Sequence, residues 1–300
     1  MLRYLAISTL VLLGCSGHAH KSSVPASADH LKGQPTRTSC DELDPSLGAR
    51  AHELLSTLYI HDCCDETLVH CLQHERRCLL AVRLAENVCR RVADGQDDES
   101  IRLAMSLRAR MMQSEHLGMI SEIDLTGMSV AGDLDAPVTL VEYAGPRGTN
   151  CAEITPLVHE AVTLGPLSGK VRLFLRPFPL RSNPHSKEAG AAFLAAQELG
   201  GLWKFVLYSY SHFDEFTPEG QRAWAEAVGL DGEQFTTLAQ DEEIVERLVE
   251  GKMEGLDNGV DSTPTFFIDG RSYLGELEIH ELVDTLDEVF ERSQGHVYEQ

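Results

Sequence analysis

Hydrophobic residues recur along this chain with two periods, which divide it into helical and strand-rich regions. Apolar positions three or four apart, separated by Gly, Pro or acidic breaks, predict helices in two blocks, before residue 115 and from about 184 to 255. Short apolar, β-branched runs predict buried strands. The expected helices are 47–60, 79–94, 99–112, 151–164, 186–199, 202–210, 218–228, 241–254 and 277–290, and the expected strands are 126–131, 138–144, 171–178, 265–269 and 272–274.

These patterns divide the chain into four expected parts. Residues 1–14 are targeting sequence, and 15–39 are a tether rich in Ser, Ala, His and Pro that has too few large apolar residues to build a core. Residues 40–115 form an all-α module, here called the cysteine-rich module. Residues 125–292 form an α/β domain with a helical insert at about 184–255.

The first 14 residues carry one basic residue, Arg3, and then an apolar run that ends in Leu12-Leu13-Gly14-Cys15. This stretch resembles a bacterial lipoprotein signal, and the resemblance implies that Cys15 becomes the lipidated N-terminus. The alternative is an ordinary secretory peptide cleaved at a small residue. No other segment is apolar for the roughly 18 residues that a spanning helix needs, so we expect a lipid-anchored protein that does not cross the membrane.

The formal net charge is −22 at neutral pH, and the acidic residues are spread over the whole chain. A surface of this charge repels phosphate backbones and anionic lipid. Nucleic-acid binding is therefore not expected.

Six cysteines lie in the cysteine-rich module, and their number and spacing suggest disulfide bonds. An exported protein meets an oxidising environment, which favours structural disulfides among Cys40, Cys63, Cys64, Cys71, Cys78 and Cys89. Cysteines seven apart on one continuous helix would be about 10 Å apart, beyond disulfide reach. The chain is therefore expected to reverse direction between 63 and 78, at 61–64 and 74–77. Six cysteines allow as many as fifteen pairings, so the connectivity stays open.

Two other hypotheses remain for this module. His61, His70 and His74 add nitrogen ligands to the cysteines, which would suit a metal site, although the usual paired C-x-x-C spacing is absent. The module is also faintly similar to the helical thiol module of cytochrome c maturation proteins of the CcmH type, without the C-x-x-C of that module. This similarity would give the cysteines a redox role.

The α/β domain begins with a strand, a Gly/Pro turn and a helix start, in the stretch Val138 to Pro156. Ala136-Pro137-Val138, Glu142-Tyr143 and Pro156 together resemble the DsbA-like branch of the thioredoxin superfamily. That resemblance aligns the family's C-x-x-C motif with Gly148-Thr149-Asn150-Cys151. Gly148 stands at the position of the nucleophilic cysteine, and only the second thiol, Cys151, remains.

A second motif supports the same family. Residues 259–270, GVDSTPTFFIDG, resemble the family's loop with a cis proline, which implies a cis Thr263-Pro264 bond facing the thiol. In the family this loop offers a backbone edge that can pair with an extended peptide, so Thr263 and Pro264 are the expected substrate-binding residues. The resemblance extends over about 165 residues and implies a thioredoxin fold with an inserted helical domain.

The missing cysteine leaves three functional hypotheses. The first is a degenerate module of the bacterial cell envelope that binds client proteins or extended peptides without dithiol turnover. The second is a thiol-disulfide oxidoreductase that acts through Cys151 alone or paired with an N-terminal cysteine, since an odd thiol remains. The third is a metal or thiol sensor centred on the cysteine-rich module. No cofactor is expected, and the lipid anchor would hold the protein facing the periplasm or the cell exterior.

Overall fold

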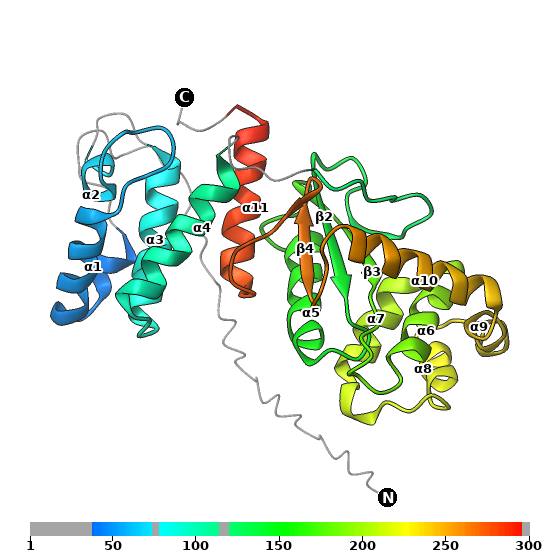
Figure 1. Cartoon of the computed structure of the whole chain (residues 1–300). Helices are drawn as coiled ribbons and strands as arrows, with labels where there is room; N and C mark the ends of the chain where they lie inside the picture. The colour runs from blue at the N-terminus through cyan, green and yellow to red at the C-terminus, as the bar shows by residue number, and fades with distance from the viewer. Residues whose placement is uncertain (1–37, 74–77, 114–119, 296–300) are drawn as a thin grey trace, which may run out of the picture. The chain divides into compact units, whose positions relative to one another are not determined.

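A computed structural model describes residues 38–73, 78–113 and 120–295. The expected α/β thioredoxin fold with an inserted helical block is present, and a helical module precedes it (Figure 1). The proposed targeting sequence and residues 15–37 of the proposed tether lie outside the described residues. None of the helices in the described part is both long enough and apolar enough to span a bilayer.

Four α-helices and one short 3-10 helix form the cysteine-rich module. They are η1 (Ser39–Glu42), α1 (Pro45–Thr57), α2 (Leu68–Cys71), α3 (Leu79–Ala93) and α4 (Asp98–Met112). Asp44 caps α1 by accepting hydrogen bonds from the backbone N–H groups of Ser46 and Leu47, and Asp97 caps α4 in the same way through Ser100. Buried Leu, Ala and Val side chains from α1 and α3 form a core of their own.

The α/β domain is built on one five-stranded sheet. Its strands are β1 (Val130–Gly132), β2 (Val138–Ala144), β3 (Val171–Pro177), β4 (Thr265–Ile268) and β5 (Arg271–Ser272), and their order in the sheet is β1-β3-β2-β4-β5. Strands β2 and β3 are parallel, and the other pairs are antiparallel. The parallel pair is joined through α5 (Thr149–Thr163), as a parallel connection requires.

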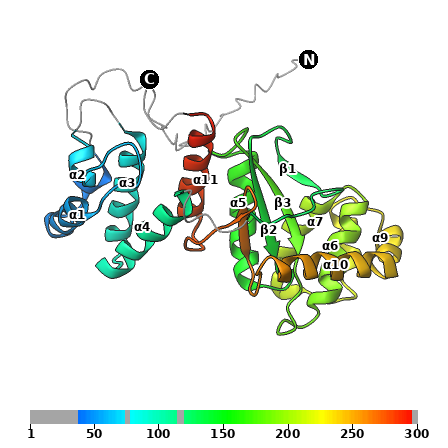
Figure 2. The ribbon, with the colours of Figure 1, turned by 45° about the horizontal axis from the view of Figure 1, so that its top comes forward.

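The two faces of the sheet are covered differently. Helices α5 and α11 (Ile279–Ser293) pack on one face, and α10 (Glu242–Asp257) lies on the other side (Figures 1 and 2). On the α10 side, Gly255 lets the helix approach closely, because a Cβ there would come within 2.9 Å of the rings of Phe178 and Tyr143. Both faces of β2 are therefore buried, which accounts for its nearly continuous apolar sequence.

The inserted block lies between β3 and β4 and is entirely helical. It contains α6 (Ser186–Glu198), α7 (Leu202–Ser211), η3 (Phe213–Glu215), α8 (Gln221–Ala227), α9 (Gly232–Ala239) and α10. Its core is rich in aromatic side chains, and the thiol-bearing residue Cys151 belongs to the same cluster. The insert therefore forms one wall around the candidate site.

Several elements differ from the sequence-based expectation, among them β5, which covers Arg271–Ser272 where the sequence predicts 272–274. The helix α9 was not expected, since Gly229 to Gly232 were interpreted as a break; Asp231 instead caps a new helix by accepting from the N–H groups of Glu233 and Gln234. The first strand is shorter than 126–131 and begins at Val130, because a turn closed by a hydrogen bond from Met128 N–H to Leu125 O occupies the preceding residues.

Candidate functional site

Cys151 lies in the first turn of α5, directly after the loop that leaves strand β2. Gly148 is the N-cap residue of this helix, and its backbone is extended, with φ −95° and ψ 125°. The Cys151 side chain is fully buried, with 0% of its surface exposed. Its sulfur accepts a hydrogen bond from the backbone N–H of Gly145 at 3.2 Å. The helix start thus holds one sulfur that faces inward.

The surroundings of Cys151 disfavour its thiolate. Burial raises the pKa of the thiol to about 12, and the nearby Glu142 carboxylate would raise it further when charged. The hydrogen bond from Gly145 N–H and the nearby Thr263 side chain act in the opposite direction but do not offset burial. At neutral pH the side chain is a thiol, and a thiol is a poor nucleophile compared with a thiolate.

Glu142 is the other titratable group of the site, and it is also neutral at pH 7. Burial raises the pKa of this carboxyl to about 8, against the hydrogen bond from Thr155, whose Oγ1 lies 2.5 Å from Glu142 Oε1. Its second oxygen is buried without a hydrogen-bond partner. From the sequence, Glu142 serves only to align the motif with the family. The signal that could have marked it as a site residue is the presence of an acid inside the apolar run VTLVEYA.

Gly148 lies close against the sulfur. A Cβ built on Gly148 would lie 3.3 Å from both Cys151 Sγ and Gly145 O, and 3.6 Å from Thr263 Oγ1. Position 148 is therefore next to the thiol and the loop at 263, where the motif alignment placed the missing nucleophile. Within the described ranges, Cys151 is the one cysteine outside a disulfide.

The loop before β4 lies against this thiol. The Thr263-Pro264 peptide bond is cis. Thr263 Oγ1 is buried and has no hydrogen-bond partner among the described residues. Asp261 and Ser262 are exposed, and Thr263 is partly exposed. Within the described part of the chain, these three residues make no backbone–backbone hydrogen bond, although the Ser262 carbonyl accepts one from Thr265 Oγ1 at 2.8 Å. The backbone groups of Asp261 and Thr263 therefore stay available beside the buried sulfur.

Arg147 fixes the thiol loop to the inserted block, a role that the sequence did not indicate. Its guanidinium lies 4.2 Å from the ring centroid of Phe213 and 4.4 Å from that of Phe216, and it donates a hydrogen bond to Phe213 O at 2.7 Å. Its own carbonyl accepts from Asn183. A guanidinium held in this way positions the loop and is not itself placed on the sulfur.

The six N-terminal cysteines form three disulfide bonds. The pairs are Cys40–Cys89, Cys63–Cys78 and Cys64–Cys71, with Cα–Cα distances of 4.9, 6.2 and 6.1 Å. The segment from 63 to 78 is not one continuous helix, and Cys63 has a positive φ of 59°. A change of direction at 61–64 agrees with this geometry, whereas residues 74–77 lie outside the described residues.

The remaining candidate residues are not brought together as a metal site. In the three described ranges, no group of three or more His, Cys, Asp or Glu side chains has a geometry that could hold a metal ion. His61 is instead 2.7 Å from Glu288 Oε1 in a buried pair. His74 and the proposed lipidation residue Cys15 lie outside the described part.

These features together define a thioredoxin-fold site with one thiol. Residues 125–288 match the family model described as Thioredoxin, and the chain belongs to this family. The fold is also similar to that of BdbD from Bacillus subtilis in its oxidised form, with 15% identity and a TM-score of 0.50 over 58% of this chain and 98% of that one. The thiol-disulfide exchange protein α-DsbA2 from Wolbachia pipientis is 22% identical, with a TM-score of 0.49 over 61% of this chain and 96% of that one.

The chain is also similar to part of much longer curated proteins. The chain is 31% identical over 185 residues to the Na(+)/H(+) antiporter NhaA 3 of Salinispora tropica, and 30% identical over 194 residues to NhaA 1 of Salinispora arenicola. These matches cover 60% and 63% of this chain but only 28% and 29% of the antiporters. The chain thus spans less than a third of these relatives.

Proposed function

We propose that this DsbA-like protein binds client polypeptides through the edge at Asp261–Thr263 and carries out no dithiol turnover. The observation that carries the proposal is the combination of unpaired backbone groups at Asp261 and Thr263, within the described residues, with a buried, protonated Cys151 and a glycine at 148. Extended peptides add to such edges through main-chain hydrogen bonds, which require no sulfur. The clients would be other proteins of the bacterial cell envelope, where a lipid anchor on Cys15 would hold the chain.

A thiol-disulfide oxidoreductase is the alternative, because one thiol, Cys151, remains at the motif position. Ordinary turnover needs an attacking thiolate and a second thiol that resolves the mixed disulfide. Here the described N-terminal cysteines are already paired with one another. Turnover through Cys151 paired with an N-terminal cysteine would therefore need an exchange reaction that first opens one of these bonds, whereas Cys151 acting alone would need a thiol from outside the chain to resolve the mixed disulfide.

Two measurements on the mature protein test the proposal. The first measures hydrogen exchange of this protein with and without a probe, a model protein that has been reduced, carboxymethylated and unfolded. Adding the probe is expected to slow exchange at the backbone amides of residues 261–263. The same protein is expected to give no insulin-reduction signal, and its Cys151 is expected to react with iodoacetamide at neutral pH only after unfolding. Rapid labelling of Cys151 with an insulin signal that disappears in Cys151→Ser would overturn the proposal in favour of the oxidoreductase.

A variant keeps the binding part of the test independent of the chemistry. Thr263→Arg places a long side chain on the proposed edge and is expected to weaken capture of the unfolded probe. Ser272→Arg on the exposed strand β5 is the matched control, with the same added charge away from the thiol. Equal binding by the two variants, without protection at 261–263 in the native protein, would rule out this edge as the binding site.

A further inference from the structure

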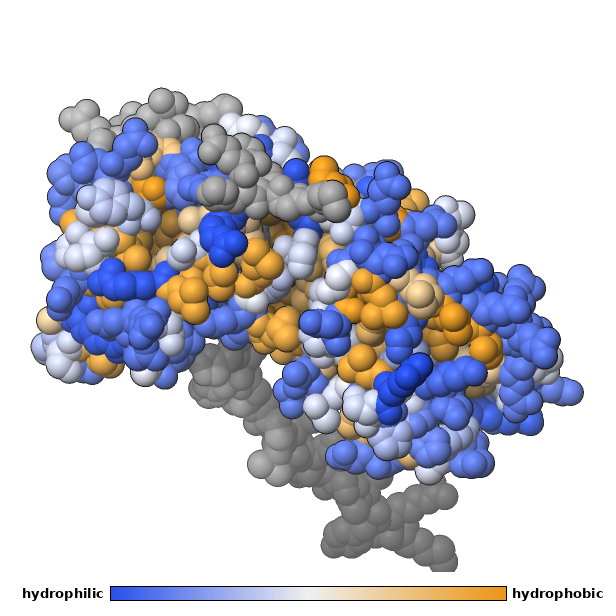
Figure 3. Space-filling model, in the orientation of Figure 1, coloured by the Kyte–Doolittle hydropathy of each residue, from blue (hydrophilic) through white to orange (hydrophobic). Residues whose placement is uncertain are grey.

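The outward face of α10 carries an apolar stripe that no described part of the chain covers. Val249, Met253 and Leu256 are 51%, 51% and 46% exposed. Their spacing of four and then three residues places them on one helix face, along about 10 Å of the helix. The face drawn in Figure 3 shows other hydrophobic residues that also reach the surface of the α/β domain. We call Val249, Met253 and Leu256 the α10 stripe.

The opposite side of α10 already satisfies the packing needs of the helix. Ile244, Leu248, Gly251 and Gly255 are buried against the rest of the domain. Isolated exposed apolar side chains are common, but a stripe at helical spacing is what remains when a helix has a second, uncovered contact face.

Free carboxylates run along one edge of the stripe. Glu246, Glu250 and Asp257 are exposed, and among the residues that the structure describes no hydrogen bond or ion pair engages their carboxylates. The two basic residues of α10 are both engaged elsewhere: Arg247 pairs with Glu198, and Lys252 donates to Pro179 O. The edge of the stripe therefore keeps its negative charge.

Asp257 is the last residue of α10, and no basic residue lies in that last turn. A carboxylate at a helix C-terminus is repelled by the helix dipole. A cation from a partner would offset this repulsion.

We infer that the α10 stripe docks an amphipathic helix of a partner polypeptide that carries Lys or Arg beside its apolar face. The apolar residues of such a helix would cover Val249, Met253 and Leu256, and its cations would meet the three free carboxylates. A second copy of this chain is disfavoured because it would bring the same carboxylates face to face. An anionic membrane surface is disfavoured for the same electrostatic reason. This inference is independent of the edge at 261–263.

A designed peptide tests the inference. The probe is a fluorescein-labelled helix of about 18 residues, with Leu at helical a and d spacing and Lys on both flanks. A second peptide of identical composition, with its Leu residues spread around the helix, controls for the attraction of any cation to this acidic chain. Anisotropy titrations at about 0.15 M salt are expected to show binding of the first peptide and at least about tenfold weaker binding of the second.

Paired variants locate the binding surface. Val249→Ser with Met253→Ser is expected to weaken binding about tenfold, while Leu164→Ser with Leu134→Ser, at other exposed leucines, leaves it unchanged. Neutralising the edge is expected to weaken binding and flatten its salt dependence, and neutralising three exposed acids elsewhere has a smaller effect. The edge variant is Glu246→Gln, Glu250→Gln and Asp257→Asn, and the control is Glu188→Gln, Glu215→Gln and Glu219→Gln.

Hydrogen exchange on the unmodified protein completes the test. Bound peptide is expected to protect residues 249–256 and to leave 261–263 unchanged. Equal binding of the two peptides, equal loss in stripe and control variants, or protection confined to 261–263 would each overturn the inference. Protection confined to 261–263 would still support the proposed function, so this experiment can reject the docking inference without rejecting the proposed function.

Discussion

Gly148 has an extended backbone conformation that any residue can adopt, so a side chain at this position meets no backbone strain. A Cβ there would lie 3.3 Å from Cys151 Sγ, which is tight but brings an attached sulfur within bonding reach. We therefore predict that Gly148→Cys forms a disulfide with Cys151 in air and reduces insulin in the presence of dithiothreitol. Thiol counting by mass spectrometry and the turbidity assay measure the two effects.

Gly148→Ser is the matched control, because it adds nearly the same volume without a thiol. It is expected to fold like the native protein and to stay inactive. If Gly148→Cys keeps two free thiols under oxidising conditions, the site geometry described above is wrong. If the disulfide forms but insulin is not reduced, some feature other than residue 148 has removed the activity.

The buried Glu142 carboxyl gives the domain a pH-dependent stability. Its pKa is raised by burial from 4.5 to about 8, so between these values the folded state holds a proton that the unfolded state has lost. The free energy of unfolding is therefore expected to fall as pH rises from 5 to 8, by about a few kcal/mol. Urea unfolding at several pH values in this interval measures the effect.

Glu142→Gln isolates this contribution, because glutamine cannot ionise and keeps the size of the protonated acid. The free energy of unfolding of the variant is expected to change less between pH 5 and 8 than that of the native protein. The other titrating groups are common to the two proteins and cancel in the comparison. Parallel pH profiles would show that Glu142 does not carry the proton at neutral pH.

At the scale of elements, the sequence indicated most of the architecture because strand and helix patterns are local. Strand β2 has the predicted bounds, since its nearly continuous apolar run at 138–144 is what a strand buried on both faces requires. The helix α9 was missed because Asp231 and Gly232 have the composition of a turn, and only the structure shows that Asp231 caps a helix. Glycine at a helix start is tolerated, so composition there is ambiguous.

The same distinction holds for the candidate site: the sequence predicts the features that local motifs carry, and it does not predict those that depend on packing between distant segments. Aligning the two motifs with the family places Gly148, Cys151 and Thr263 in one site, because the two motifs lie side by side in the fold of that family. The alignment did not reveal that Cys151 is fully buried or that Arg147 lies between two rings of the insert, since both depend on packing between distant segments. The disulfide pairing also depends on how distant segments pack, so the sequence alone does not determine it.

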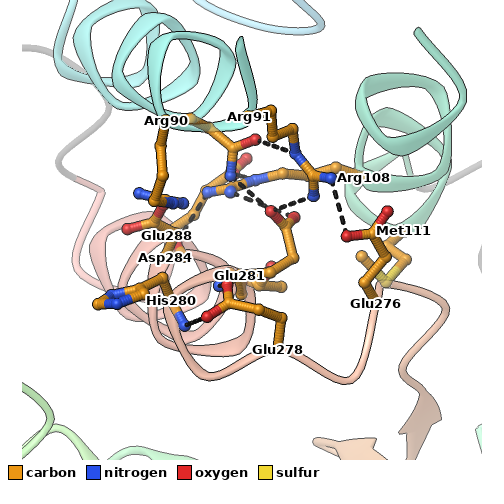
Figure 4. Close-up of polar contacts among 12 residues, drawn as sticks. Arg90, Arg91, Arg108, Met111, Glu276, Glu278, His280, Glu281, Asp284 and Glu288 are labelled. Carbon is orange, nitrogen blue, oxygen red and sulfur yellow. Dashed lines mark hydrogen bonds and ion pairs between the residues drawn. The ribbon is translucent and has the colours of Figure 1, made fainter. Parts of the chain in front are cut away.

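At the scale of the whole molecule, a polar seam joins the cysteine-rich module to α11 of the α/β domain (Figure 4). Arg108 of α4 is fully buried and lies 2.9 Å from Glu288 and 3.7 Å from Glu281. Arg91 of α3 pairs with Glu281 at 2.9 Å. Burial alone would raise the pKa of Glu288, but the hydrogen bond from His61 and the charge of Arg108 lower it to about 2.

This seam predicts that the two parts unfold together and that Arg108 is needed for both. Arg108→Ala leaves the buried Glu281 and Glu288 carboxylates with fewer partners, and removing one member of a buried ionic cluster typically costs about 3–5 kcal/mol. We expect a loss of this size in the free energy of unfolding, measured in urea by far-UV circular dichroism. Arg222→Ala, which breaks an exposed pair with Glu226, is expected to change the free energy of unfolding far less, because water screens exposed ion pairs.

A second substitution separates charge from packing at the seam. Glu288→Gln in the Arg108→Ala background removes the unpaired buried charge, so it is expected to recover part of the lost free energy, although in the native protein the same change is destabilising. Additive losses would mean that Arg108 acts through its hydrocarbon stem rather than its charge. Two separate transitions in the native protein would contradict the seam itself, since joined parts with a shared ionic core should unfold in one step.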